Sequence, residues 1–596
     1  MGLLQKAVET YDCHKNLVGV YRPEHTVLAP IYHTTVSADI EITINTNGNF
    51  ISAAEVDKSE PKIIIPVSEK SAGRSGTTVC AHPLSDQLCY VSPYNKEKFK
   101  NYKEKLSSWC NSEYSAPKAE AVLKYIEKGS ILKDLQTAGL IKLSADGRPE
   151  NEKLMVCWRV IGNDSGDDDA CWLDTGLFDS YIKYYSKLQD SGEKDLCMIS
   201  GEFAAPAVNT PKNIISGSAN AKLVSSNDTS GFTYLGRFTS SSQALYISSE
   251  ASQKAHNALR WLAAEQGAKA VFGGRTFLCW NPHGRKVQSV TGAFAMFAKP
   301  QLKPSDYRKE LQNTLNGCRS ELPANEDVVI AVFDAATSGR LSLTYYNELI
   351  GSDFLQRLYD WDLHCCWPAG KFGIQSPPLW QIVNCSFGTQ TIEKGREIFK
   401  TDERIMRQQI QRLVSCRIDK SNMPADILKA ITQRCSRLQL YEKNLRKMLL
   451  STACAVIRKY RYDIYEEEWE MTLDENKADR SYQFGRLLAV LEKVERDTYD
   501  SDEGREPCAI RQQSIFCRRP LYAANNIEAQ LERAYFPRLK PGARIYYKNL
   551  IGQIMSQINE FPPDQWNKAL GETYLMGYYL QRNALYTAKD KTEEEN

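Results

Sequence analysis

From about residue 396 to its end, the 596-residue chain has the periodicity of packed α-helices. Apolar residues recur at helical spacing and so share one face of a helix, as do Phe484, Leu487, Leu488, Leu491 and Val494. Prolines, which end or kink helices, separate such stretches, at Pro424, Pro520, Pro537 and Pro562. This part of the sequence therefore predicts a bundle of several helices over residues 396–596.

The preceding residues, 1–395, have a mixed pattern. Residues 40–44 alternate between apolar and polar side chains before Asn47 and Gly48, which is typical of a half-buried strand followed by a tight turn. Residues 328–333 are continuously apolar and predict a strand covered on both faces. Helices are expected over residues 119–128 and 252–266. We predict an α+β fold, with an α+β region over residues 1–395 and the helical bundle over residues 396–596.

The charge of the whole chain is nearly balanced, with 75 Lys and Arg against 73 Asp and Glu. A surface that binds polyanions must therefore be local. Within the helical half, the ratio of basic to acidic residues is 13 to 5 over residues 401–460, 7 to 15 over 461–510, and 8 to 2 over 511–550. The two basic strips suit a phosphate backbone, although solvated helix faces have the same pattern. Tyrosines interleaved with them either stack on bases or pack in the core, namely Tyr441, Tyr460, Tyr462, Tyr546 and Tyr547.

The 17 cysteines include no C-x-x-C pair, and no apolar run approaches 18 residues. Cysteines without regular spacing in a long chain indicate reduced thiols. We therefore expect a cytoplasmic protein with no membrane partner.

Signals for catalysis are weak. The chain lacks a P-loop, a G-x-S-x-G motif and an H-E-x-x-H motif. Its densest acidic stretch contains Asp164, Asp167, Asp168 and Asp169, and clustered carboxylates can hold Mg²⁺ for phosphoryl chemistry. This stretch is rich in Gly, Ser and Asn, however, which favours a surface loop. We predict no catalytic residue, no metal and no cofactor, with a Mg²⁺-dependent nuclease that uses Asp167–Asp169 as the alternative.

The most unusual segments are residues 221–238 and 252–267. The first predicts a strand from Ala221 that runs into a turn and out again, and small polar residues around Gly231 let backbone N–H groups approach an anion or a base edge closely. The second predicts a helix with Ala255, Leu259, Leu262 and Ala263 on its core face. Three polar residues lie largely off that face: Lys254, Asn257 and Arg260.

These segments resemble the large subunit of the type I-C (Dvulg subtype) CRISPR Cascade complex. Further matches lie at residues 196–202, 471–475, 482–492 and 576–586. Residues 73–76, followed by 88–90, are similar to the family's basic Ser/Thr-Gly turn and the strand after it. Residues 210–214 read Thr-Pro-Lys-Asn-Ile, where the family commonly has a His-Pro-Lys-Ile-Arg-like segment, so a basic contact is expected to be lost there.

The resemblance implies a non-catalytic subunit that recognises the protospacer-adjacent motif in target double-stranded DNA. It also implies help in opening the duplex, in stabilising the R-loop formed by the guide RNA, and in recruiting a helicase-nuclease. The implied partners are the crRNA, the target DNA, the Cascade backbone and crRNA-processing subunits, small subunits and, transiently, the helicase-nuclease. A purely structural scaffold remains a further possibility.

Two loops and one helix supply the predicted nucleic-acid contacts. Residues 73–76 and 227–231 are expected at the DNA or at the crRNA 5′ end, unless they are ordinary polar turns. Arg237, Lys254 and Arg260 are expected to contact phosphates or to form surface ion pairs. His256 is expected to be an orienting or satisfied residue of its helix. The predicted contact residues are Arg74, Ser75, Gly76, Asn227, Asp228, Thr229, Arg237, Lys254, Asn257 and Arg260.

The helical bundle is also similar to a free small subunit of the family that is made by internal translation. Met471 is predicted to open a helical segment. Glu466–Glu468 lie just upstream, and their purine-rich codons suit a ribosome-binding sequence. We therefore expect residues 471–596 to be made also as a separate product.

Overall fold

The computed structural model describes residues 2–22, 25–58, 62–74, 78–162, 169–190, 192–215, 220–225, 235–264, 269–295, 303–337, 339–370, 373–500 and 504–594. The chain forms two compact units. Unit 1 comprises Met1–Val287 and Asp327–Glu348, and unit 2 comprises Gln288–Glu326 and Leu349–Asn596. The helical region expected from residue 396 onward is one part of unit 2.

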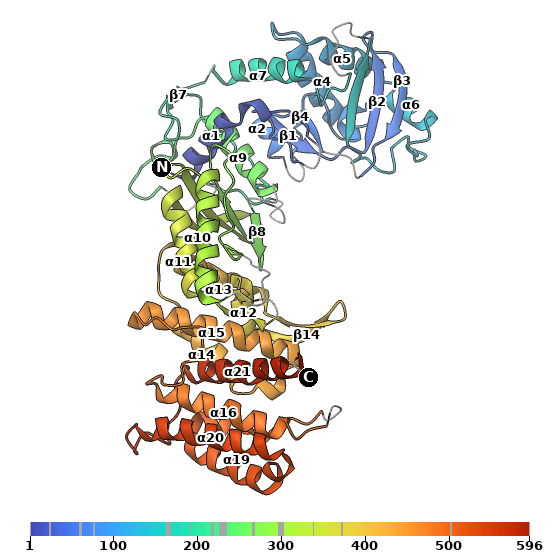
Figure 1. The fold of residues 1–596 in the computed structure, drawn as a ribbon. Coiled ribbons are helices and arrows are strands. Elements are labelled where there is room, and N and C mark those ends of the chain that lie inside the picture. Colours follow the sequence, from blue (N-terminus) through green and yellow to red (C-terminus); the bar gives the residue numbers. More distant parts are fainter. Residues whose placement is uncertain are drawn as a thin grey trace. The chain divides into compact units, whose positions relative to one another are not determined.

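One core of unit 1 surrounds a three-stranded sheet with the order β3-β2-β5. The central strand β2 (Ile40–Asn45) runs antiparallel to β3 (Phe50–Glu55) and parallel to β5 (Val156–Ile161). The predicted turn before β3 is confirmed, because Gly48 has a φ of +69° and the Asn45 side chain accepts the N–H groups of Asn47 and Asn49. Helices lie beside this sheet (Figure 1), namely α4 (Lys96–Cys110), α5 (Pro117–Lys128), α6 (Ile131–Thr137) and α7 (Thr175–Asp190).

A second core of unit 1 lies under a four-stranded sheet with the order β11-β10-β9-β8. Residues 328–333 of β10 are fully buried, as their apolar run predicts. The helix α9 (Ser249–Ala264) packs on α1 (Leu3–Cys13), and both helices contribute to the core that β9 and β10 share. The strands are β8 (Lys269–Phe272), β9 (Arg275–Trp280), β10 (Asp327–Thr337) and β11 (Arg340–Ile350).

Short elements join these two parts of unit 1. They are the antiparallel pair β1 (His33–Val36) and β4 (Ile63–Pro66), the hairpin β6 (Asp195–Leu196) and β7 (Phe203–Ala204), and the helices α2 (Glu69–Ala72), α3 (Leu88–Val91) and α8 (Ser241–Ala244). The strand expected at residues 88–90 is wrong, because these residues form α3 with all four side chains buried. The strand expected from Ala221 is also wrong over the described residues 221–225, where only isolated bridges of Lys222 occur.

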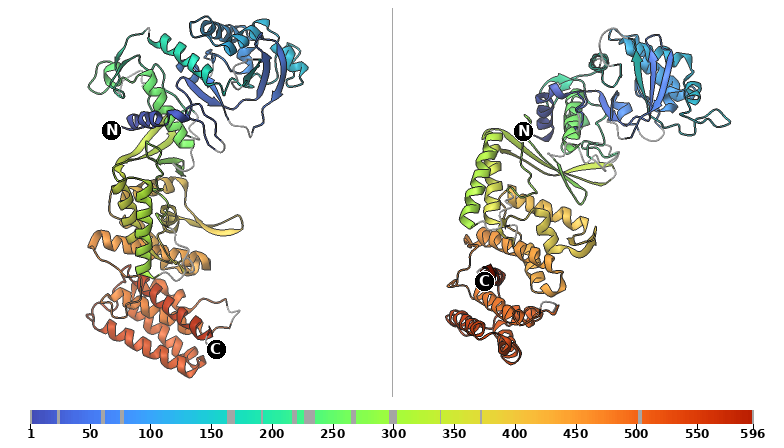
Figure 2. Two further views of the ribbon diagram at one scale, coloured as in Figure 1. Left: turned by 45° about the horizontal axis from the view of Figure 1, so that its top comes forward. Right: turned by 45° about the vertical axis from the view of Figure 1, so that its right-hand side comes forward.

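The first part of unit 2 combines helices with small hairpins. Helices α10 (Pro304–Glu321) and α11 (Gly351–His364) pack on each other. They are followed by the short pair β12 (Trp367–Pro368) and β13 (Ile374–Gln375), and by α12 (Leu379–Phe387). The hairpin of β14 (Thr389–Glu393) and β15 (Arg396–Lys400) has a projecting tip (Figures 1 and 2), while its base contacts α12 and α15 (Lys443–Tyr465).

The remainder of unit 2 is the predicted helical bundle. Its helices are α13 (Glu403–Ile418), α14 (Ala425–Cys435), α15 (Lys443–Tyr465), α16 (Arg480–Arg496), α17 (Cys508–Arg511), α18 (Gln513–Arg518), α19 (Pro520–Ala534), α20 (Pro541–Asn559) and α21 (Tyr574–Glu594). α16 is buried around its whole circumference because α19, α20 and α21 all pack against it. The α+β fold class is thus confirmed, and no helix of the described ranges is both long and apolar enough to cross a bilayer.

Candidate nucleic-acid interface

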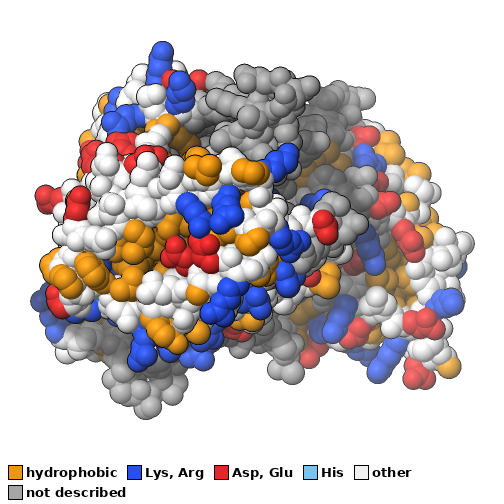
Figure 3. Space-filling view, turned by 60° about the horizontal axis from the view of Figure 1, so that its bottom comes forward, with side chains coloured by type: hydrophobic (Ala, Val, Ile, Leu, Met, Phe, Trp, Pro, Cys, Tyr) orange, Lys and Arg blue, Asp and Glu red, His pale blue; other side chains and the backbone are white. Residues whose placement is uncertain are grey.

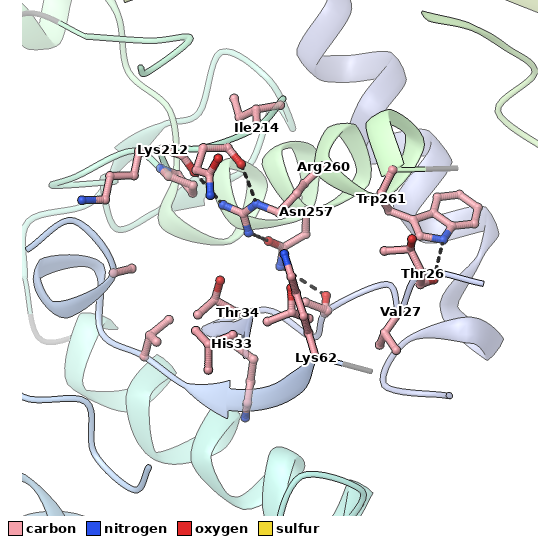
Figure 4. Close-up of a pocket in the computed structure, with 18 of the residues that line it drawn as sticks. Thr26, Val27, His33, Thr34, Lys62, Lys212, Ile214, Asn257, Arg260 and Trp261 are labelled. Atoms are coloured by element: carbon pink, nitrogen blue, oxygen red, sulfur yellow. Dashed lines mark hydrogen bonds between the residues drawn. The ribbon is translucent and has the colours of Figure 1, made fainter. Parts of the chain in front are cut away.

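A cavity of about 840 Å³ lies within unit 1, between α9 and β1. Figure 4 shows Asn257 and Arg260 of α9 on one side, His33 and Thr34 of β1 on the opposite side, and Thr26 and Trp261 at a third wall. Residues of segments 25–29 and 211–215 and of the end of α2 also line it, together with Lys62, Val67, Arg74, His82 and Lys269. The cavity therefore gathers parts of unit 1 that are far apart in the sequence.

The described lining of this cavity is cationic. It contains five Lys and Arg side chains and no Asp or Glu; the five are Lys62, Arg74, Lys212, Arg260 and Lys269. His33 and His82 also line it, but burial lowers the pKa of each imidazole to about 4, so both are neutral at pH 7. The five Lys and Arg side chains therefore give the described lining its positive charge, and His25 also lines the cavity.

Arg260 is held in the wall of the cavity by hydrogen bonds to backbone carbonyl oxygens. Its Nη2 donates to the carbonyl oxygen of Lys212 at 2.8 Å, and its Nε donates to that of Asn213 at 3.3 Å. Within the described residues no carboxylate pairs with it. Burial lowers the pKa of the guanidinium to about 10, so it stays protonated at neutral pH. A partly desolvated cation without a counter-charge is stabilised when an anion binds beside it.

Asn257 positions Arg260 from one turn earlier on α9. Its Oδ1 accepts Arg260 Nη1 at 3.2 Å, while its Nδ2 donates to the carbonyl oxygens of Ala29 and Pro30 at 3.2 and 3.1 Å. Asn257 lies off the core face of α9 as expected, but it is not a surface residue, since the segment of Ala29 and Pro30 covers it and leaves it only 2% exposed. Hydrogen bonds to carbonyls of the neighbouring segment make its burial possible.

Arg74 lines the cavity, but its guanidinium is used inside the fold. It donates to both carboxylate oxygens of the buried Asp86, at 2.7 and 2.5 Å, and to the carbonyl oxygen of Cys80 at 3.1 Å. The guanidinium also stacks 4.4 Å from the ring centre of Tyr90. The other two predicted contact residues of this loop, Ser75 and Gly76, lie outside the described residues.

Lys212 is a cavity cation absent from the predicted contacts. Its Nζ donates to the carbonyl oxygen of Arg74 at 2.9 Å and to Asn220 Oδ1 at 3.4 Å, both neutral acceptors. Burial, and next the nearby Arg74, lowers the pKa of its ammonium group. The available sequence signal was its place in the Thr210–Ile214 segment, where the chain departs from the family pattern but keeps the lysine. Lys62 and Lys269 carry no comparable signal.

A comparison with protein families accounts for nearly the whole chain. The family described as CRISPR-associated protein (Cas_Csd1) matches residues 9–586. The chain belongs to the CRISPR-associated Csd1 family. The match includes the residues of the cavity and almost all of both units, and it supports a Cascade-type subunit. No curated protein matches the chain.

Two other predicted contacts of this Csd1 protein, Lys254 and Arg237, are not among the described residues that line the cavity. Lys254 forms ion pairs with Asp12 and Glu250, at 3.1 and 2.8 Å. Arg237 is exposed, with its guanidinium 5.2 Å from the ring centre of Phe238. Asn227, Asp228 and Thr229 lie outside the described residues. His256 is buried and bonds through Nδ1 to the carbonyl oxygen of Ser252 at 2.6 Å, but its buried Nε2 has no hydrogen-bond partner among the described residues, so the expectation of a residue satisfied within its helix holds for Nδ1 only.

The acidic stretch of this Csd1 protein is only partly described. Asp164, Asp167 and Asp168 lie outside the described residues, whereas Asp169 lies within them. Nowhere in the part of the chain that the structure describes do three or more His, Cys, Asp or Glu residues come together as they would to hold a metal ion.

The two basic strips of the helical region of this Csd1 protein differ in how completely they are exposed to solvent. In the strip over residues 401–460, three of the cations are buried, namely Arg417, Arg458 and Lys459. In contrast, every Lys and Arg of residues 511–550 is exposed: Arg511, Arg518, Arg519, Arg533, Arg538, Lys540, Arg544 and Lys548. Figure 3 looks onto the end of the molecule that carries the C-terminal helices, where Lys and Arg lie among hydrophobic side chains.

The tyrosines interleaved with the basic strips also differ in their exposure and contacts. Tyr546 is 53% exposed, next to Arg544, whereas Tyr547 is buried and its hydroxyl bonds to Asp497. Tyr462 stacks on His364 at a centre-to-centre distance of 3.6 Å, and Tyr441 packs edge-on against Phe399. Of these four, Tyr546 is therefore the one best placed to meet a base.

Proposed function

We propose that the chain is the large, non-catalytic subunit of a type I-C Cascade complex in the cytoplasm. In this role it recognises the protospacer-adjacent motif in target double-stranded DNA, helps to open the duplex, and stabilises the R-loop formed by the guide RNA. It works with the crRNA, the Cascade backbone and crRNA-processing subunits and the small subunits, and it helps to recruit the helicase-nuclease. Membership in the Csd1 family supports this proposal.

The observation that carries the proposal is the cationic cavity of unit 1. Lys212 and Arg260 are both partly buried there, and their hydrogen bonds within the described residues go to neutral acceptors. Phosphate groups are the anions that a nucleic acid presents at every position. A local site of this kind explains how a chain with a net charge of only +2 can bind a polyanion.

The exposed basic strip over residues 511–550 suits a second task. Cations that follow a strand, with aromatic rings between them, bind single-stranded nucleic acid without strong sequence preference. Tyr522 and Tyr546 are 55% and 53% exposed within this strip. We assign the strip to the displaced strand of the R-loop.

The assembled complex should be tested on DNA targets with a library of flanking sequences. If Lys212 contacts a phosphate, Lys212→Ala should weaken binding to all sequences alike and lower the slope of log affinity against log salt concentration by about one. If Lys212 contacts a base edge, the same variant should lose the preference for one base of the flanking sequence, at a cost of about 1–3 kcal/mol. Lys254→Ala is the matched control, because Lys254 is already neutralised by Asp12 and Glu250.

Two results would contradict the proposal. Equal affinity of the complex for correct and scrambled flanking sequences would leave the chain a structural scaffold. Mg²⁺-dependent cleavage of DNA by the purified chain, abolished when Asp167–Asp169 are replaced by Asn, would make it a nuclease.

A further inference from the structure

We propose that the cavity between α9 and β1 encloses one nucleotide of a single strand. Its phosphate binds at Lys212 and Arg260, and its base and sugar enter the space between the two walls. This inference rests on the proposed function of the cavity and adds the form in which the nucleic acid is bound.

The first argument is the size of the cavity. Sites that enclose a small molecule have volumes of about 300–1,000 Å³, and this cavity measures about 840 Å³. A contact to the phosphates of an intact duplex needs a surface but no such hollow, and a paired base cannot enter one. Bases turned out of a strand, in contrast, are bound in pockets of this kind.

The second argument is the chemistry of the walls. Apolar side chains form much of the described lining, and they come from several segments: Val27, Val36, Val67, Ile214, Ile215, Trp261 and Ala263. A base offers two apolar faces and a polar edge, so it needs such walls with a few polar groups between them. Thr34, Thr35 and Gln253 are lining residues that can supply those groups.

The third argument is the position of the charge. Arg260 is tied to the backbone of residues 212 and 213, and Lys212 to the backbone of Arg74, so both cations belong to one wall. Figure 4 shows the side chains of Lys212 and Arg260 on the side of the cavity away from His33 and Thr34. Lys62 directly precedes β4, the partner strand of β1, so a further cation reaches the cavity from the side of His33 and Thr34. The cavity thus combines cations with the apolar lining described above, which suits a nucleotide with its charged phosphate and neutral base.

The test fills the cavity without removing a charge. Ala264 is exposed at the end of α9 and lines the cavity, so Ala264→Trp adds bulk there and leaves all five cations in place. Ser242→Trp, at an exposed position of α8 outside the lining, is the matched control. The probes are short single strands, one of RNA and one of DNA, each with a single photoreactive 5-iodouracil. The full chain is irradiated with each probe, and the linked residue is located by mass spectrometry.

We expect the base to link to a lining residue in the unmodified chain and in Ser242→Trp. In Ala264→Trp the yield of that product should fall at least tenfold, and affinity for the strand should fall with it. The probe that links more strongly identifies the source of the nucleotide, RNA or DNA.

Other outcomes separate this inference from the proposed function. If Ala264→Trp changes neither yield nor affinity while Lys212→Ala still weakens binding, the cavity binds phosphates only and the enclosed nucleotide is refuted. A product located outside the lining also refutes it. If neither substitution weakens binding, the cavity is not a nucleic-acid site and both proposals fail.

Discussion

The carboxylate of Asp86 has no exposed surface, and both of its oxygens accept hydrogen bonds from Arg74. The same carboxylate accepts the backbone N–H groups of His82 and Gln87, each at 2.7 Å. Arg74 is therefore the counter-charge of a buried acid that holds the backbone at His82 and Gln87 in place. This makes Arg74 a positioning residue, although the motif around it first marked it as a contact to DNA.

Arg74→Ala should destabilise unit 1 by about 3–5 kcal/mol, because removing one partner of a buried ion pair leaves an uncompensated charge. Thermal unfolding of the purified chain measures the effect. Arg237→Ala is the control, since Arg237 is exposed and contacts the ring of Phe238. If both variants unfold at the temperature of the unmodified chain, the ion pair does not stabilise unit 1.

Two glycines allow α16 and α21 to approach closely. A Cβ atom on Gly485 would lie 1.9 Å from the carbonyl oxygen of Tyr574, and one on Gly577 would lie 2.1 Å from that of Tyr482. Both obstacles are backbone atoms, so the helices would have to separate. Gly485→Ala or Gly577→Ala should therefore destabilise unit 2 by about 1–3 kcal/mol or more.

Gly552 of α20 provides the matched control for these glycines. It is exposed within a helix, and a Cβ atom there would meet nothing within 4 Å. Gly552→Ala should stabilise the chain by up to about 1 kcal/mol, because alanine is the better helix former. Thermal unfolding of the three variants tests the pair of predictions. Equal effects at positions 485 and 552 would contradict the close contact.

The sequence predicts elements more reliably than it predicts the site. The burial of residues 328–333 and the turn at Gly48 follow from local patterns, which also predict the helices of unit 2. The cavity depends on contacts between distant segments, such as Arg260 with the backbone of residues 212 and 213. No local pattern records which cation meets a buried acid, so Arg74 and Lys212 could not be distinguished before the fold was known. The burial of Asn257 likewise depends on a distant segment, Ala29 and Pro30, and no local pattern records that contact.

Three buried histidines should make the chain sensitive to acid. Burial lowers the pKa of His33, His82 and His256 to about 4 in the folded chain, against about 6.5 when unfolded. Between these values the unfolded chain binds more protons, so stability falls as the pH falls from about 6.5 to 4. Glu69 acts in the opposite direction, because burial raises the pKa of its carboxyl group.

The melting temperature should therefore be lower at pH 5 than at pH 7.5. His256→Gln should reduce this difference, because it removes one of the three titrating groups. Each histidine contributes about 1.4 kcal/mol per pH unit at most within that range. If His256→Gln left the difference between the two pH values unchanged, the prediction that His256 contributes to the acid sensitivity would be wrong.

Met471 lies in the connection between α15 and α16, and not at the start of a helix as predicted, because α16 begins at Arg480. A chain that starts at Met471 would still contain α16–α21 complete, including the close contact of α16 with α21. We therefore expect a separate product of residues 471–596 to fold and to co-purify with the full chain. Met471→Leu should abolish this product and keep the full chain folded, because leucine has a similar volume and the Met471 side chain is buried near Cys366. N-terminal sequencing of the small chain decides the point. A small chain that begins at another residue, or that persists in Met471→Leu, would exclude Met471 as its start.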